Sequence, residues 1–178
     1  YSVDLKYVYA DVGGMAYEKH KTALPQETID ICEQVDAILF GSVGGPKWDN
    51  LPYDEKIERV SILGLRKHFD FYANLRPVFL HSQMSATSPI RNLDNGFDMM
   101  IVRELSGDAY FGPKQLEEDF AIDEIRYTKN QCLRIAKIAF ETAKKRKKRV
   151  TCIDKSNVFS TSVLFRNCIK SVSKDYPS

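Results

Sequence analysis

Residues 37–52 read AILFGSVGGPKWDNLP, and this stretch decides how the chain around it can fold. Its first four residues form an unbroken apolar run that ends at Gly41, which is typical of a strand buried on both faces. Residues 43–52 are rich in Gly, Pro, Asp and Asn, and this composition predicts a loop. A short buried strand that ends in such a loop favours an α/β fold.

Helices and strands alternate on both sides of this stretch. Apolar residues at helical spacing predict helices over residues 25–35, 54–69, 129–146 and 160–174. Shorter apolar or alternating runs predict strands over residues 3–9, 71–80, 97–102, 109–112 and 150–153. The alternation predicts an α/β protein with a substantial parallel component, in which helices flank a mixed sheet.

The same alternation leads us to expect an incomplete chain. A strand should follow the helix that ends near Asp175, yet the sequence stops at Ser178, and no initiator Met stands at the front. We therefore expect a truncated fold whose sheet lacks a neighbour at the C-terminal end.

Composition places the chain among soluble globular proteins. Its 178 residues are 43% hydrophobic and 28% charged, enough for one domain or two small lobes. A net charge of +2 favours no polyanionic partner, and the basic run at residues 144–149 is better explained as a solvated helix end than as a nucleic-acid patch. The four cysteines show no CxxC spacing, which predicts a reduced, cytoplasmic protein. No apolar run is long enough for a membrane span, so no membrane partner is expected.

Three arginines stand at the ends or edges of apolar runs rather than in charged clusters. They are Arg66, Arg76 and Arg103. A guanidinium binds a carboxylate through two parallel hydrogen bonds, so three that converge would suit a small substrate with more than one carboxylate. Taken singly, each is more simply explained as solvated or paired with a surface acid.

Four strings make the chain similar to a known family. They are GSVGGPKWDNLP (residues 41–52), LRKHFDFYANLRP (65–77), VRELSGDAYFG (102–112) and DKSNV (154–158). In order and spacing they resemble the 3-isopropylmalate dehydrogenases, a branch of the metal-dependent β-decarboxylating dehydrogenases. The resemblance implies the isocitrate/isopropylmalate dehydrogenase-like fold, which is not a Rossmann fold. It covers about the first half of the family's length and lacks the opening strand and helix.

The resemblance also implies a division into lobes. Residues 1–80 would be part of the first, cofactor-side lobe, and residues 81–178 part of the second lobe, which carries dimerisation and substrate contacts. In the family the protein is a homodimer.

Site roles follow from the resemblance, residue by residue. Arg66, Arg76 and Arg103 match arginines that bind the malate carboxylates, and Ile62 and Leu63 match positions that contact the isopropyl group. An apolar pair at those positions favours a branched aliphatic substituent over a third carboxylate, although any packed helix also shows an apolar face.

Two further residues match catalytic positions. Tyr110 matches a tyrosine that supplies a proton late in the reaction, and Lys155 matches a lysine that acts through water as a base and reaches into the partner's site. Outside these strings, a half-buried strand tyrosine and a surface lysine would be the simpler interpretations. Ser156 stands where Ala is common in the family, a mild departure.

A third group matches the segment that passes beside bound NAD. Its members are Gly45, Pro46, Lys47, Trp48, Asp49, Asn50, Leu51, Pro52, Glu58 and Asn157. The alternative is an ordinary loop between a strand and a helix. Oxidative decarboxylation also needs Mg²⁺ or Mn²⁺, and the family's metal-binding aspartates lie beyond Ser178, so no metal ligand is assigned in this chain.

The resemblance thus implies NAD-dependent oxidative decarboxylation of 3-isopropylmalate in leucine biosynthesis, with this chain by itself inactive. Isocitrate, tartrate and homoisocitrate dehydrogenases are alternatives of the same class. A different alternative is a catalytically silent module that only binds a dicarboxylate or pairs with a full subunit.

Overall fold

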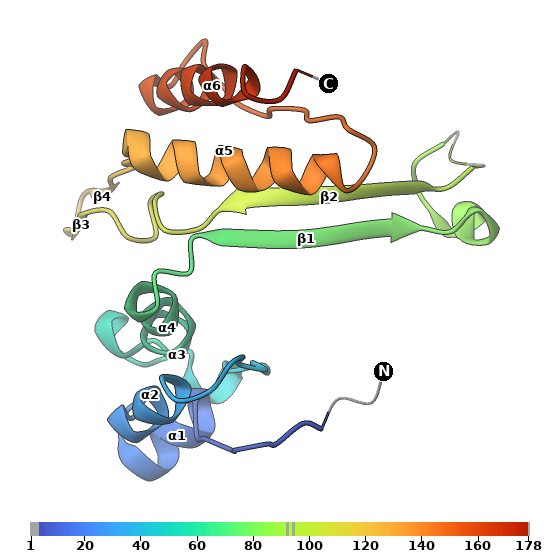
Figure 1. The fold of residues 1–178 in the computed structure, drawn as a ribbon. Coiled ribbons are helices and arrows are strands. Elements are labelled where there is room, and N and C mark those ends of the chain that lie inside the picture. Colours follow the sequence, from blue (N-terminus) through green and yellow to red (C-terminus); the bar gives the residue numbers. More distant parts are fainter. Residues whose placement is uncertain (1–3, 92, 94, 178) are drawn as a thin grey trace. The chain divides into compact units, whose positions relative to one another are not determined.

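The structure is a computed structural model that describes residues 4–91, 93 and 95–177, and it divides into two compact units. One unit holds the described residues up to Asp70, and the other holds those from Phe71 onward (Figure 1). The lobe boundary expected after residue 80 stays a prediction.

The first unit is helical. Its elements are α1 (Gly13–His20), α2 (Gln26–Cys32), α3 (Ile57–Val60) and α4 (Ile62–His68), with two short 3-10 helices, η1 (Pro46–Trp48) and η2 (Tyr53–Glu55). The sequence pattern did not predict α1. This helix starts at Gly13, which has a φ of +72°. A Cβ at this position would lie within 3 Å of Val43. Glycine is therefore required where α1 starts.

The core of this unit is small. Ala16, Ala23, Ile57 and Leu65 are its buried apolar side chains. The helix predicted over residues 54–69 is broken into η2, α3 and α4, and the break between α3 and α4 falls at buried Ser61. The Ser61 hydroxyl donates to the Ile57 carbonyl oxygen over 2.6 Å, a side-chain bond that competes with helix continuation.

Two strands predicted in this unit are absent. Residues 4–9 and residues 37–40 form no strand, and Val3 lies outside the described residues. Tyr9 and Leu39 are 92% and 99% exposed, although the apolar run at Leu39 predicted burial on both faces. A buried strand exists only between neighbours, and no described segment pairs with either stretch.

The second unit contains both described sheets. β1 (Ala73–Leu80) pairs antiparallel with β2 (Phe97–Glu104), and the short β3 (Lys114–Leu116) pairs with β4 (Ala121–Asp123). β1 and β2 confirm the strands predicted over residues 71–80 and 97–102. A 3-10 helix, η3 (Ser82–Thr87), follows β1. Both sheets are two-stranded, so β1 and β2 form an isolated ribbon within the described residues.

Two long helices follow in layers, the first packed on β2 and the second packed on the first (Figure 1). α5 (Lys129–Lys144) and α6 (Ser160–Ser173) confirm the helices predicted over residues 129–146 and 160–174. α5 starts with a capping box in which Thr128 and Gln131 each accept the other's backbone N–H. Cys132 and Ile135 of α5 and Cys168 and Val172 of α6 are buried.

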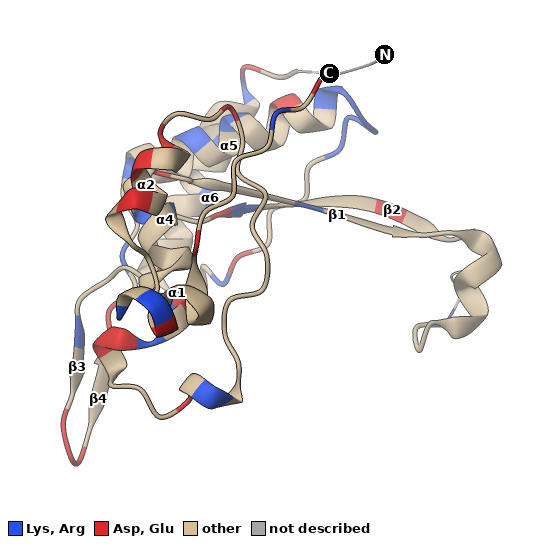
Figure 2. Cartoon of the chain, turned by 90° about the horizontal axis from the view of Figure 1, so that it is seen from below, with Lys and Arg blue, Asp and Glu red and all other residues tan. Residues whose placement is uncertain are grey.

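The basic run, residues 144–149, begins at the last residue of α5 and continues into the loop that follows (Figure 2). The side chains of Lys144 and Lys147 are exposed, as expected for a solvated helix end, while Arg146 bonds Asp98 of β2. Cations at a helix C-terminus are favoured by the helix dipole.

The parallel pairing predicted for this chain is not present among the described residues. Residues 150–153 and 109–112 were predicted as strands, but neither stretch forms one. The apolar run at 150–153 has strand composition, yet a strand needs a partner for its backbone groups. The class remains α/β.

Candidate functional site

Arg76 and Arg103 lie on one face of the ribbon. Arg103 is directly opposite Asn74 in the register of β1 and β2, and Arg76 is two residues beyond Asn74 on the same strand. Residues that are paired across two strands, or two apart on one strand, lie on the same face of a sheet. Arg76 and Arg103 therefore occupy diagonal positions on that face. The Arg76 Nε donates to the Asn74 Oδ1 over 2.6 Å, which places Asn74 between them.

Tyr110 joins this face. The guanidinium carbon of Arg103 lies 5.5 Å from the centre of the Tyr110 ring, in cation–π range. Arg103 also donates a long hydrogen bond, 3.4 Å, to the Asp108 carboxylate. The Tyr110 side chain is half exposed. The structure thus brings together a cation that could bind a carboxylate and a phenol that could donate a proton.

Buried Glu104 anchors the turn that carries Asp108 and Tyr110. Its carboxylate accepts from the backbone N–H groups of Ser106, at 3.0 Å, and Gly107, at 2.7 Å, and the Arg134 guanidinium lies 4.0 Å away. A buried carboxylate with several donors is strongly held. Sequence reasoning missed Glu104, although an acid that directly follows an apolar strand at a Ser-Gly turn was a usable signal.

Tyr127 closes the turn from the other side. Its ring packs on Gly107, where a Cβ would come within 2.6 Å of the ring. Burial, with the nearby Asp108 carboxylate, raises the pKa of Tyr127 to about 12. This phenol therefore stays protonated and serves packing.

Lys155 and Asn157 lie on the loop before α6. Both side chains are exposed. The preceding residue, Asp154, forms two 2.7 Å hydrogen bonds with Arg166 of α6, and this partner lowers the pKa of Asp154 to about 2. Within the described chain, the Lys155 ammonium forms no hydrogen bond or ion pair. Asp154 therefore fixes the loop, on which the Lys155 side chain is exposed.

In the first unit, the loop over residues 45–52 is held by α1. The Trp48 indole N–H donates to Glu18 over 2.9 Å, and the Lys47 ammonium lies 2.9 Å from the same carboxylate oxygen. Trp48 packs on Gly14, where a Cβ would come within 2.5 Å of the ring. Lys47, followed by Trp48, lowers the pKa of Glu18. The exposed members of this loop are Pro46, Lys47, Asp49, Asn50 and Pro52, and Gly45 and Leu51 are half-buried.

Glu58 lies beside the same loop. A Cβ on Gly44 would come within 1.8 Å of the Glu58 carboxylate, so the bare glycine backbone makes room for this acid. Glu58 therefore lies against the backbone of Gly44, next to the predicted cofactor-binding loop.

Ile62, Leu63 and Arg66 lie on α4. All three are half-buried, and Ile62 and Arg66, four residues apart, share one helix face. One helix could thus supply both an apolar contact, from Ile62, and a guanidinium that binds a substrate carboxylate, from Arg66. The structure describes each unit by itself, so it brings together Arg76, Arg103 and Tyr110, and the approach of Arg66 to them stays a prediction.

The family model described as "Isocitrate/isopropylmalate dehydrogenase" matches residues 1–178. The chain belongs to the isocitrate/isopropylmalate dehydrogenase family. The 3-isopropylmalate dehydrogenase of Campylobacter jejuni (strain RM1221) is 48% identical over 178 residues, which are 99% of this chain and 50% of that protein. The corresponding enzyme of Pseudoalteromonas translucida (strain TAC 125) is 51% identical over 172 residues, or 93% of this chain and 48% of that one.

Solved structures agree with the family assignment. A β-decarboxylating dehydrogenase from Thermococcus kodakarensis, in its apo form, superposes with a TM-score of 0.68 at 30% identity over 97% of this chain and 46% of its own. Isocitrate dehydrogenase from Methylococcus capsulatus gives a TM-score of 0.74 at 26% identity over 93% of this chain and 47% of its own. This family member therefore spans about half the length of the relatives it matches.

The described part of this family member offers no complete metal site. No three His, Cys, Asp or Glu side chains among the described residues gather where they could hold one ion. Mg²⁺ and Mn²⁺ require several oxygen ligands around one point, so the residues described do not fit such an ion by themselves. None of the described helices is long and apolar enough to cross a membrane.

Proposed function

We propose that this chain contributes the part of an NAD-dependent 3-isopropylmalate dehydrogenase that binds the substrate carboxylates. The observation that carries the proposal is the face on which Arg76, Arg103 and Tyr110 meet. Two guanidinium groups suit a substrate with two carboxylates, and the phenol suits an enol that needs a proton.

The roles of the chain's own residues follow from their positions. Arg76 and Arg103 bind and orient the malate carboxylates, joined by Arg66 from α4. The half-buried Ile62 and Leu63 contact the isopropyl group, since apolar side chains favour an aliphatic substituent over a carboxylate. Tyr110 donates the proton to the enol after carbon dioxide leaves.

Lys155 acts as the base that receives the hydroxyl proton through a water molecule. Its exposed ammonium, on a loop fixed by Asp154 and Arg166, supports a role toward a second subunit, so the working form is a homodimer. A base lysine needs a depressed pKa, which the enclosed site of a dimer would provide.

Residues 45–52 and Glu58 would hold NAD, and Asn157 would contact its nicotinamide side. The Glu18 contacts that hold Lys47 and Trp48 support this placement because they keep the loop in one conformation. The bound cofactor would supply the acceptor for the hydride that leaves the hydroxyl-bearing carbon. Mg²⁺ or Mn²⁺ would take its ligands from outside the described residues.

The test is an assay of the chain fused in frame to the second half of the Campylobacter jejuni relative. NADH formation is compared between 3-isopropylmalate and isocitrate in the presence of Mn²⁺. Preference for 3-isopropylmalate supports the proposal, and equal or greater turnover of isocitrate contradicts it. Leu63→Arg is the diagnostic variant, because a cation at that position should shift the preference toward the third carboxylate.

A further inference from the structure

Ser106 lies at the junction of three polar contacts in the second unit. Its hydroxyl donates to the Glu104 carboxylate over 2.5 Å and accepts from the side chains of Arg134, over 2.5 Å, and Gln131, over 3.3 Å. A serine hydroxyl has one hydrogen to donate and two lone pairs that accept, so these three bonds use its full capacity. The position of Ser106 is therefore fixed from three directions.

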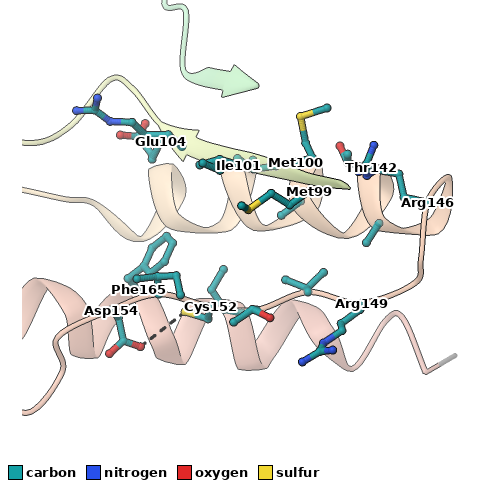
Figure 3. A pocket seen from close by; sticks show the side chains of 18 of the residues that line it. Met99, Met100, Ile101, Glu104, Thr142, Arg146, Arg149, Cys152, Asp154 and Phe165 are labelled. Carbon is teal, nitrogen blue, oxygen red and sulfur yellow. Dashed lines mark hydrogen bonds between the residues drawn. The ribbon is translucent and has the colours of Figure 1, made fainter. Parts of the chain in front are cut away.

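Two of these contacts come from the first turns of α5. The Gln131 Oε1 accepts the Thr128 N–H over 2.8 Å in the capping box, which leaves the Gln131 NH₂ group directed at Ser106. Arg134 follows three residues later, on the same side of the helix. Figure 3 shows Glu104 at the end of β2, beside the beginning of α5. The start of α5 thus presents two donors to one hydroxyl of the turn after β2.

Arg134 also contacts the ribbon at both of its strands. Its guanidinium carbon lies 4.2 Å from the centre of the Tyr72 ring, in cation–π range. Tyr72 directly precedes β1, and its carbonyl oxygen accepts from the N–H of Leu105, which directly follows β2. The Arg134 Nη2 lies 4.0 Å from the Glu104 carboxylate, whose side chain is only 4% exposed. One guanidinium therefore joins this end of the ribbon to the turn that follows it.

The turn held in this way lies between the two candidate site residues. Arg103 directly precedes Glu104, and Tyr110 stands four residues after Ser106. The Gly107 N–H also donates to the Glu104 carboxylate, over 2.7 Å. The Arg103 guanidinium and the Tyr110 ring lie 5.5 Å apart, so a turn that loosened would change their separation.

We propose that Arg134 is a positioning residue, which holds the turn through Ser106 so that Tyr110 stays beside Arg103, a role that rests on the proposed function of those two residues. Lysine could not replace it, because an ammonium has no planar group to lie over the Tyr72 ring while it donates to the hydroxyl.

Hydrogen exchange tests the hold on the turn without substrate. In the 178-residue chain, the backbone N–H groups of Ser106 and Gly107 should exchange about tenfold faster in Arg134→Met than in the parent, because the turn opens more often. Residues 97–101 of β2 should keep their rates. Lys137→Met, which removes an exposed cation from the same helix, is the matched control and should change neither set. Unchanged exchange at Ser106 and Gly107 in Arg134→Met would overturn the proposal.

A double-mutant cycle tests whether Arg134 acts through Tyr110. The fused enzyme is assayed with whichever of 3-isopropylmalate and isocitrate it turns over faster. Arg134→Met should lower kcat about tenfold in the parent, but less than about twofold in the Tyr110→Phe background, because the group it positions is already gone. Equal losses in both backgrounds would assign Arg134 to stability alone and refute the positioning role.

Two further outcomes separate this proposal from the proposed function. If Arg134→Met fails to fold, Ser106→Ala removes the same junction with a smaller change, and it should give the same exchange and kinetic pattern; parent-like behaviour of Ser106→Ala would contradict the proposal. An undiminished kcat in Tyr110→Phe would reject the role of Tyr110 in the proposed function, and the exchange rates of Ser106 and Gly107 would then decide the hold of Arg134 on the turn.

Discussion

The Arg103 guanidinium lies 5.5 Å from the centre of the Tyr110 ring and donates a 3.4 Å hydrogen bond to the Asp108 carboxylate. Asp108 and Tyr110 belong to a turn held by the buried Glu104 carboxylate. One turn therefore sets the positions of both the Arg103 guanidinium and the Tyr110 phenol. A substrate carboxylate could replace the long Asp108 contact without moving the ring.

Replacing Arg103 by Met in the assembled enzyme should remove a charge-assisted grip worth about 1.5–3 kcal/mol, or about 10- to 100-fold in kcat/KM for 3-isopropylmalate. The measurement is steady-state NADH formation. Arg126→Met, on an exposed position of the same unit, serves as the control and should leave kcat/KM unchanged. An unaltered kcat/KM in the Arg103 variant would show that this guanidinium does not touch substrate.

Glu104→Ala should destabilise the second unit by about 1–3 kcal/mol, because the backbone N–H groups of Ser106 and Gly107 lose their buried acceptor. Urea unfolding followed by circular dichroism measures the loss. Glu117→Ala, on an exposed turn, is the matched control. If both variants unfold at the same urea concentration as the parent chain, the turn does not depend on this carboxylate.

The fluorescence of Trp48, the single tryptophan, should report on Glu18. Lys47 and Trp48 lower the pKa of Glu18 in the folded state, so their contacts are present above the ordinary glutamate pKa and are lost as pH falls through the lowered value. We expect an emission change in acid, below the ordinary range. Glu18→Gln should remove that step and Glu27→Gln should keep it. A step that survives in Glu18→Gln would assign it to another group.

The pairing of Asp154 with Arg166 makes a second pH prediction. The pKa of Asp154 is lowered to about 2, so its contribution to stability is complete above the ordinary aspartate pKa and disappears as pH falls from there toward 2. Arg166→Met should flatten the dependence of the unfolding midpoint on pH in this window. A curve with the same slope as that of the parent chain would contradict the assignment.

The sequence predicted helices better than strands, and the reason is physical. α5 and α6 satisfy their backbone hydrogen bonds internally, so apolar spacing and the Thr128 capping box were sufficient to predict them. Strands over residues 37–40 and 150–153 need partners that the described residues do not supply. β1 and β2 were predictable because each is the other's neighbour in the register.

The candidate site residues could be predicted only where short sequence strings resembled those of the family. Arg76, Arg103 and Tyr110 were named from the sequence, and the structure places them on one face. Glu104 was missed although its place before a Ser-Gly turn was a usable signal. Glu18 was missed because its contact with Trp48, 30 residues away in the sequence, leaves no spacing signal. The substrate and catalytic roles of Arg66, Arg76, Arg103 and Tyr110 stay predictions.

The chain alone should not turn over 3-isopropylmalate. Arginines can hold the carboxylates and Tyr110 can deliver a proton, but the described residues gather no set of ligands for a divalent cation beside them. Without that cation the enolate loses its main electrostatic stabiliser, typically several kcal/mol of barrier. The assay follows NADH with purified chain, NAD, Mn²⁺ and 3-isopropylmalate, before and after addition of the second-half polypeptide of the Campylobacter jejuni relative. Activity should appear only after the addition, and Tyr110→Phe should abolish most of it while Tyr53→Phe, in the first unit, should not. Turnover by the chain alone would show that its own side chains complete the site.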